Sequence, residues 1–190
     1  MTIFFTSDQH YGHKNVIKLC NRPFDDLTHM REMLIYNQNQ IVGPDDTVIH
    51  MGDFSFLNAT ETAAIVARLN GHQIIVRGNH DRKRASLENC GFEVWTSSYM
   101  EWVAPFPYLQ TPFWLSHYPK GIFDHPDSEP RFLDRRPPDD DRWLMCGHVH
   151  NAWKANWLKK MINVGVDAWN YRPIHLSEII CIVEGGPPNE

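Results

Sequence analysis

The sequence has no apolar run long enough to span a membrane, no surplus of basic residues and no closely spaced cysteine pair. A transmembrane helix needs about 20 consecutive apolar residues, and no stretch of the 190-residue chain approaches that length. The first residues, Met1 to Thr6, also lack the basic start and long apolar centre of a signal peptide. We therefore expect no membrane association, and we interpret these residues as a first strand.

The charge balance excludes one class of partner. The formal net charge is −5 with histidine counted as neutral. Stable binding to duplex nucleic acid depends on Lys and Arg contacts to phosphates, so we do not expect it. A nucleotide substrate stays compatible with this charge, because bound divalent metal ions supply local positive charge. Eleven histidines are many for a chain of this length, and several fall in the motifs described below.

The cysteines are few and scattered: Cys20, Cys90, Cys146 and Cys181. A zinc knuckle or a disulfide framework needs closer pairing than this spacing provides. We interpret all four as free thiols in a reducing compartment, where buried cysteine behaves as a small apolar residue. The expected location is the cytoplasm.

The first 90 residues alternate short β-branched runs with longer amphipathic stretches. We expect strands at residues 2–7, 47–50 and 73–77, and helices at residues 14–20, 25–42 and 60–69. This alternation favours α/β layers around a partly parallel sheet.

Beyond Gly91 the pattern changes to short apolar runs with short connections. We expect strands there at residues 92–95, 99–103, 113–116, 143–146, 161–166 and 179–183, forming a second, mixed or antiparallel sheet. Residues 120–142 are rich in Pro and Asp and predict an irregular segment beside the site. The expected fold is α/β: two mixed sheets packed face to face with flanking helices. It forms a single domain over residues 1–184, followed by a flexible tail over residues 185–190.

Five clusters place metal-ligating side chains at the ends of apolar runs. They are Ser7-Asp8-Gln9-His10, Gly52-Asp53, Gly78-Asn79-His80-Asp81, Ser116-His117-Tyr118 and Gly147-His148-Val149-His150. Each alone has an ordinary explanation as a turn or cap residue. Together they indicate a two-metal hydrolytic site, because two divalent ions about 3.5–4 Å apart can bind both oxygens of an in-line phosphoryl displacement. The mixture of oxygen and nitrogen donors suits Mn, Fe, Ni or Zn, and the absence of thiolate ligands argues against structural zinc.

In this order the clusters resemble the signature of the calcineurin-like metallophosphoesterase superfamily: D-x-H, G-D, G-N-H-[DE], a lone His and G-H-x-H. The resemblance spans Asp8 to His150, and the first strand and residues 163–167 (NVGVD) extend it. The short chain resembles the compact bacterial, archaeal or phage members. The resemblance implies a four-layer αββα sandwich and two metal ions, with manganese expected.

The resemblance also implies a role for each matching residue. Asp8, His10 and His150 would bind the first metal, Asn79, His117 and His148 the second, and Asp53 would bridge both. His125 is the alternative to His117. A metal-bridging hydroxide would be the nucleophile. His80 would protonate the leaving oxygen or stabilise charge on the phosphate, and Asp81 would orient His80.

Residues outside the motifs give weaker expectations. Arg22 is a candidate for binding a substrate phosphate, because a guanidinium grips phosphate bidentately; an ordinary surface arginine is the alternative. The same two interpretations apply to Arg131, Arg135 and Arg136. His13 is a candidate for lining the pocket. Four aromatic residues are candidates for stacking on a nucleobase, although packing is the favoured interpretation: Trp153, Trp157, Trp169 and Tyr171.

The predicted function is a dinuclear metal-dependent phosphoesterase acting on phosphodiesters, phosphomonoesters or both, with a small diester such as a cyclic nucleotide favoured. One alternative is a nuclease or RNA-end-processing enzyme. Such an enzyme needs a row of basic residues beside the metals, and Lys154, Lys159 and Lys160 are candidates for the start of one. The other is a non-catalytic protein-binding scaffold, which predicts replaced ligands.

Overall fold

The computed structural model describes residues 1–105, 107, 112–121 and 131–186. Its first sheet contains β1 (Ile3–Thr6), β2 (Thr47–His50), β3 (His72–Val76), β4 (Glu93–Trp95) and β10 (Ile174–His175), in the order β10-β1-β2-β3-β4. Strands β1 to β4 run parallel to one another, and β10 pairs antiparallel with β1. The sheet is therefore mixed, with the carboxyl ends of its parallel strands on a common edge.

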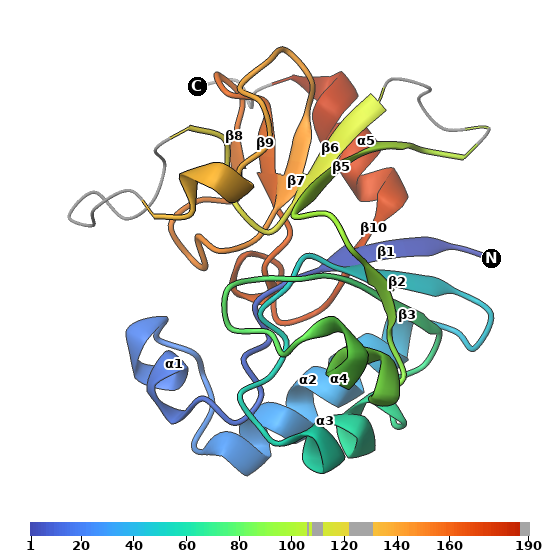
Figure 1. Ribbon diagram of the computed structural model, residues 1–190, viewed down its shortest axis with the longest axis vertical. Helices are drawn as coiled ribbons and strands as arrows, with labels where there is room; N and C mark the ends of the chain where they lie inside the picture. The colour runs from blue at the N-terminus through green and yellow to red at the C-terminus, as the bar shows by residue number, and fades with distance from the viewer. Residues whose placement is uncertain (106, 108–111, 122–130, 187–190) are drawn as a thin grey trace.

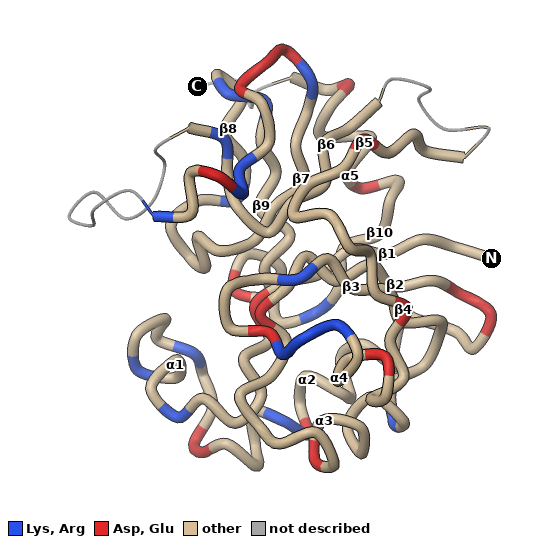
Figure 2. Tube along the Cα trace, in the orientation of Figure 1, with Lys and Arg blue, Asp and Glu red and all other residues tan. Residues whose placement is uncertain are grey.

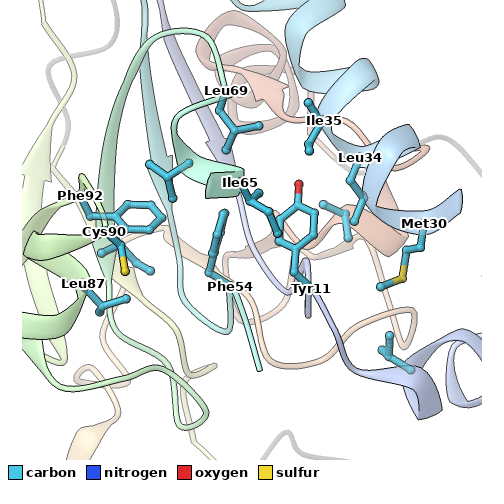
Figure 3. Packing of buried hydrophobic residues seen from close by; sticks show 14 of the residues in the cluster. Tyr11, Met30, Leu34, Ile35, Phe54, Ile65, Leu69, Leu87, Cys90 and Phe92 are labelled. Atoms are coloured by element: carbon cyan, nitrogen blue, oxygen red, sulfur yellow. The ribbon is translucent and has the colours of Figure 1, made fainter. Parts of the chain in front are cut away.

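Four helices lie on one side of this sheet: α1 (Lys14–Leu19), α2 (Leu27–Ile41), α3 (Ala59–Val66) and α4 (Arg84–Asn89) (Figure 1). Local sequence fixes where two of them begin. The Asp26 carboxylate accepts the His29 N–H at the start of α2, and Asn58 and Glu61 form a capping box at the start of α3. Side chains such as Tyr11, Phe54 and Ile65 fill the space beneath them (Figure 3).

The second sheet contains β5 (Tyr99–Val103), β6 (Pro112–Ser116), β7 (Leu144–Cys146), β8 (Ala155–Asn156) and β9 (Met161–Asn163), in the order β5-β6-β7-β9-β8. Strands β6, β7 and β9 are parallel neighbours, and both edge strands are antiparallel. Two short 3₁₀ helices, η1 (Leu133–Arg135) and η2 (Val166–Ala168), lie in the connections, and α5 (Leu176–Gly185) follows β10.

The two sheets pack face to face around one apolar core. Phe5 and Ile49 from the first sheet meet Leu115 and Met145 from the second, and Ile179 of α5 joins them. All five side chains are at most 2% exposed, so the interface between the sheets is buried and apolar. The expected fold class, two mixed sheets with flanking helices, is confirmed.

Two expected strands were assigned wrongly. Residues 93–95 form β4, but this strand extends the first sheet, in parallel with β3, and does not belong to the second. Residues 179–183 lie in α5. Leu176, Ile179 and Ile180 are buried at helical spacing, and His175 with Glu178 forms a capping box; a short apolar run alone does not separate a strand from a buried helix.

Smaller differences concern the ends and the short elements. The strand expected over residues 161–166 ends at Asn163, and the sequence did not indicate α4, β8 or β10. Helix α5 reaches Gly185, inside the expected tail, and residues 187–190 of that tail lie outside the described residues.

The topology brings two sets of loops together. Parallel strands carry their following loops on the same edge, which is where α/β proteins bind ligands. The segment after β1 meets the segment after β9 through the bridge between Ser7 and Gly165, where the Val166 N–H donates to the Ser7 carbonyl at 3.0 Å. The carboxyl edges of both sheets therefore face one shared region.

Candidate metal centre

The five sequence clusters all follow strands that end at this shared region. Residues 7–10 follow β1, Gly52 and Asp53 follow β2, residues 78–81 follow β3, His117 follows β6, and residues 147–150 follow β7. The first three loops belong to the first sheet and the last two to the second. Residues up to 142 positions apart in sequence therefore line one site, Asp8 and His150 being the extremes.

An unusual backbone conformation marks the expected ligands. Five of the seven have positive φ angles: Asp8, His10, Asp53, His148 and His150. Non-glycine residues adopt this conformation uncommonly and at an energetic cost, so the surrounding structure must hold them there. Backbone bonds between the loops do so: the Asp8 N–H donates to the Gly52 carbonyl at 3.0 Å, and the His10 N–H to the Asp53 carbonyl at 3.1 Å.

Two glycines are required by close approach to the ligands. A Cβ on Gly78 would lie 2.2 Å from Asp53 Oδ1, and a Cβ on Gly147 would lie 2.0 Å from Ser7 Oγ and 2.5 Å from Asp8 Oδ2. All three distances are far below van der Waals contact. The glycines of the G-N-H and G-H-x-H motifs therefore make room for the two aspartates.

Asp8, His10 and His150 form a first group of donor atoms, which lie within 4.8 Å of one another. His10 Nε2 is 3.7 Å from Asp8 Oδ1, and the His10 and His150 rings stack at 4.9 Å. Asp8 Oδ1 and His10 Nε2 are buried and have no hydrogen-bond partner among the described residues. Buried polar atoms are normally satisfied, so this pair fits a bound cation.

The electrostatics of the first group also suit a cation. Burial by itself would raise the pKa of Asp8, but the surrounding histidines, His10 first, lower it, so the carboxyl group is ionised. Burial would lower the pKa of His150, but its hydrogen bonds, first of all to Asp167, raise it instead. The site thus favours positive charge.

His117 is the centre of a second group. Its Nε2 lies 3.1 Å from Asn79 Oδ1, 3.2 Å from His148 Nδ1 and 3.5 Å from Asp53 Oδ2. Its Nδ1 lies 2.6 Å from the Met51 carbonyl, which can only accept a hydrogen bond. The proton of a neutral His117 is therefore on Nδ1, and the lone pair of Nε2 is available to a metal.

Asp53 lies between the two groups. Its Oδ2 is 3.7 Å from His10 Nε2 in the first group and 3.5 Å from His117 Nε2 in the second. Its Oδ1 accepts the backbone N–H of His80 at 2.9 Å, which fixes the carboxylate. One carboxylate oxygen facing two donor groups is an arrangement that suits a bridging ligand.

His80 lies at the rim, outside both groups. Its side chain is 46% exposed, and its Nε2 is 4.0 Å from Asp53 Oδ2. The ring packs against Phe56 at a centroid distance of 4.7 Å, and Phe56 stacks in turn on His13 at 4.3 Å. His13 is thus at the rim, as expected of a pocket-lining residue, with its ring 5.5 Å from that of His10.

Asp81 does not fit the role expected for it. Its carboxylate accepts backbone N–H groups from Asp53 at 2.7 Å, Phe54 at 2.9 Å and Gly78 at 2.8 Å. Among the described contacts it makes none with the His80 ring. Burial, followed by the Asp53 charge, raises the pKa of Asp81. Asp81 therefore joins the loops after β2 and β3 through backbone bonds, one of them to the Asp53 N–H.

Arg22 also differs from the expectation. The side chain is fully buried, and its guanidinium donates to both carboxylate oxygens of Asp167 and to the carbonyls of Asp8 and Gln9. The remaining N–H points to the Met30 sulfur. Every donor is engaged, so Arg22 has none to offer a substrate phosphate.

The other peripheral residues are mostly structural. The Arg136 guanidinium donates to the carbonyls of Pro119 and Arg131. Trp169 is buried and donates its indole N–H to the Asn163 carbonyl. The alternative ligand His125 lies outside the described residues. Sequence reasoning assigned no role to Asp167, although this residue ends the recognised run over residues 163–167.

Two mixed sheets packed face to face, with carboxylate, amide and imidazole groups gathered where their strands end, define a metal-dependent phosphoesterase. More particularly, residues 1–167 match the family model described as the calcineurin-like phosphoesterase superfamily domain, so the chain belongs to that superfamily. Members typically depend on two metal ions and hydrolyse phosphate esters. No helix in the described part of the chain is long and apolar enough to cross a membrane.

Relatives of similar length come from an archaeon, a phage and a bacterium. The uncharacterized protein MJ1445 of Methanocaldococcus jannaschii is 31% identical over 97% of this chain and 92% of its own length. The Gene 66 protein of Mycobacterium phage L5 is 29% identical over 95% of this chain and 93% of its own length. The crystal structure of AQ665 from Aquifex aeolicus, a protein of unknown function, matches with a TM-score of 0.71 and 29% identity. The match covers 94% of this chain and 97% of AQ665.

Proposed function

We propose that the protein uses two divalent metal ions to hydrolyse small phosphodiesters, phosphomonoesters or both. The observation that carries this proposal is the position of Asp53 Oδ2, which faces His10 Nε2 at 3.7 Å and His117 Nε2 at 3.5 Å. Asp8, His10 and His150 would hold one ion, Asn79, His117 and His148 the other, and Asp53 both. Bound ions of this kind act as Lewis acids and lower the pKa of water. Manganese is the favoured metal, and the donor set also suits Fe, Ni or Zn.

His80 is the proposed proton donor to the leaving oxygen. It belongs to neither donor group, and its exposed imidazole can reach a substrate bound beside Asp53. A protonated Nε2 donates to the oxygen on which negative charge develops when the P–O bond breaks. Such donation helps a poor alkoxide leaving group most, which favours a diester such as a cyclic nucleotide over a monoester.

The alternatives have less support. The lysines that would begin a nucleic-acid track are engaged elsewhere: Lys154 lies over the Trp169 ring at 3.8 Å, Lys159 pairs with Asp139 and Lys160 with Asp141. Figure 2 shows Lys and Arg spread over several elements among Asp and Glu. A non-catalytic scaffold needs no complete ligand set, whereas this chain has every motif residue.

The proposal also covers the binding partners of the protein and its cellular compartment. The substrate is a small phosphate ester, and no stable duplex nucleic-acid complex is expected from the net charge of −5. The cysteines are free thiols, three of them buried, which supports a reducing compartment such as the cytoplasm.

The test is hydrolysis of bis-p-nitrophenyl phosphate and p-nitrophenyl phosphate by metal-stripped protein, before and after addition of Mn²⁺. We expect Mn²⁺ to restore cleavage, with the diester cleaved faster. Faster cleavage of the monoester would change the assignment to a phosphatase. No cleavage of either compound, with two ions bound per chain, would contradict a broad phosphoesterase and favour the scaffold.

A further inference from the structure

We propose that Arg22 and Asp167 form a positioning pair that assembles the first metal group and leaves the second group unaffected. The inference rests on the proposed two-metal function, and it assigns a role to two residues that are not themselves expected ligands. Arg22 follows α1, and Asp167 lies in η2, so they are 145 positions apart in the chain.

The pair has the geometry of a strong, specific contact. Arg22 Nε donates to Asp167 Oδ1 at 2.7 Å, and Nη2 donates to Oδ2 at 2.8 Å. The two side chains are 0% and 1% exposed. Two parallel charge-assisted bonds fix the relative position of guanidinium and carboxylate. Burying two charges rarely gains stability over a well-packed apolar pair, so the specific bonds need another explanation.

The Arg22 end of the pair holds the loop after β1. Nη2 donates to the Asp8 carbonyl at 2.7 Å, and Nη1 donates to the Gln9 carbonyl at 2.8 Å. Asp8 and His10, on either side of Gln9, have φ angles of 60° and 54°. The guanidinium therefore binds the backbone at the point where this loop turns two ligands of the first group inward.

The Asp167 end holds the third ligand of the same group. Asp167 Oδ2 lies 3.2 Å from His150 Nδ1. A carboxylate in this position accepts the Nδ1 proton and leaves the Nε2 lone pair to a metal, and partners of this kind commonly change metal affinity by 10–100-fold. Arg22 and Asp167 thus connect His150 to the backbone of Asp8 and Gln9, and Gln9 directly precedes the third ligand, His10.

The second group is oriented by other contacts. His117 Nδ1 faces the Met51 carbonyl at 2.6 Å, and the Asn79 amide oxygen faces His117 Nε2 at 3.1 Å. The described hydrogen bonds of Arg22 and Asp167 go to Asp8, Gln9, Met30 and His150, and a link from the first group to the second runs through Asp8, whose Oδ2 accepts the His148 N–H at 3.0 Å. A change in the pair should therefore affect one ion selectively.

A third metal site explains the cluster less well. Cys20, His150 and Asp167 also have donor atoms within 4.8 Å of one another. Both Asp167 oxygens already accept bonds from Arg22, and one of them faces His150 Nδ1. The carboxylate is therefore occupied as a support for His150.

The experiment measures Mn²⁺ binding to metal-stripped protein by titration calorimetry, with electron paramagnetic resonance of the loaded protein. The variants are Asp167→Asn and Arg22→Lys. We expect the unchanged protein to bind two ions and give a spin-coupled spectrum. We expect each variant to bind one ion with unchanged affinity and the other at least about 10-fold more weakly, with an uncoupled Mn²⁺ spectrum at limiting metal.

Two controls separate positioning from general destabilisation. Arg172→Lys alters a bidentate pair with Glu178 away from the site and should leave both affinities unchanged. The double variant Arg22→Met with Asp167→Leu leaves no unpaired buried charge, so we expect it to fold while losing the first ion even if the single variants unfold. Folded variants that bind two ions as tightly as the unchanged protein would overturn the inference. An unchanged protein that binds no ions would instead overturn the proposed function.

Discussion

The two halves of the sandwich contribute different chemistry to the metal centre. The loops of the first sheet supply both carboxylates and the amide, from Asp8, Asp53 and Asn79, together with His10. The loops of the second sheet supply only imidazoles: His117, His148 and His150. Each donor group takes residues from both halves, so neither half holds a complete group by itself.

In the first half, a hydrogen-bond network holds the negatively charged ligand Asp53. Asp53 is held by the His80 N–H, its own N–H is held by Asp81, and Asp81 also binds Phe54 and Gly78. Backbone donors offset part of the repulsion between the carboxylates, and bound cations would offset the rest. The second half supplies neutral ligands that add no charge. Because each donor group takes residues from both halves, bound metals should join the two halves.

Asp53→Asn tests the contribution of the first half most severely. The amide keeps the size of the side chain but loses the charge that faces both donor groups at 3.7 and 3.5 Å. We expect loss of both ions at micromolar metal and a fall in activity of about 10⁴-fold, because metal ions contribute several kcal/mol to such reactions. Elemental analysis and the p-nitrophenyl assay measure the two effects.

The matched change in the second half is His117→Ala. It removes one neutral ligand, so one ion should remain in the group of Asp8, His10 and His150. If His117→Ala and Asp53→Asn lost the same number of ions, the two halves would not differ in the way described.

His80→Ala separates catalysis from metal binding within the first half. The side chain is exposed and lies outside both donor groups. We expect two ions per chain, an unchanged KM and a kcat lower by about 10³-fold, as is usual when a general acid is removed. The fall in kcat should be smaller for a substrate with a good leaving group. Loss of an ion from this variant would show that His80 is a ligand after all.

The sequence predicted the part of the site that short motifs encode. Asp8, Asp53 and Asn79 come two or three residues after strands, each beside a characteristic neighbour, and parallel strands bring such ends to one edge. The strands before Gly91 and the helices α1, α2 and α3 were recognisable for the same reason, since local periodicity and caps determine them. The short helix α4 was not.

The missed features depend on contacts between distant residues. Arg22 and Asp167 are 145 positions apart, so no local pattern could reveal that the arginine was already paired. Asp81 was assigned to the adjacent His80, whereas it binds backbone atoms of the neighbouring loop. Residues 179–183 were ambiguous because a buried helix and a buried strand can both be apolar over five residues.

Low pH should lower the free energy of unfolding through His50, which lies in β2 of the first sheet. This ring is buried between Gln9 and Gln73, and burial lowers its pKa from 6.5 to about 4. Between these pH values the unfolded chain binds a proton that the folded chain does not. Stability therefore falls as the pH drops from 6.5 towards 4, by about 3 kcal/mol in total, and falls no further through His50 below pH 4.

Denaturant unfolding of metal-free protein at several pH values measures this loss. His50→Gln is the control, because a neutral amide can bond to Gln73 and does not titrate. The difference between the two proteins should shrink by about 3 kcal/mol between pH 6.5 and pH 4. A constant difference over that range would mean that folded His50 takes up a proton as readily as the unfolded chain.

Phe56→Leu should have the smallest effect, and it tests whether the Phe56 ring orients His80, whose ring has no described contact with Asp81. Phe56 is 41% exposed, and its ring lies between those of His80 and His13. Aromatic pairs contribute about 0.5–1.5 kcal/mol beyond their buried area, so we expect kcat to fall by up to about 10-fold with two ions still bound. Phe56→Tyr should keep full activity. An unchanged kcat in Phe56→Leu would mean that substrate, and not the first half of the sandwich, positions His80.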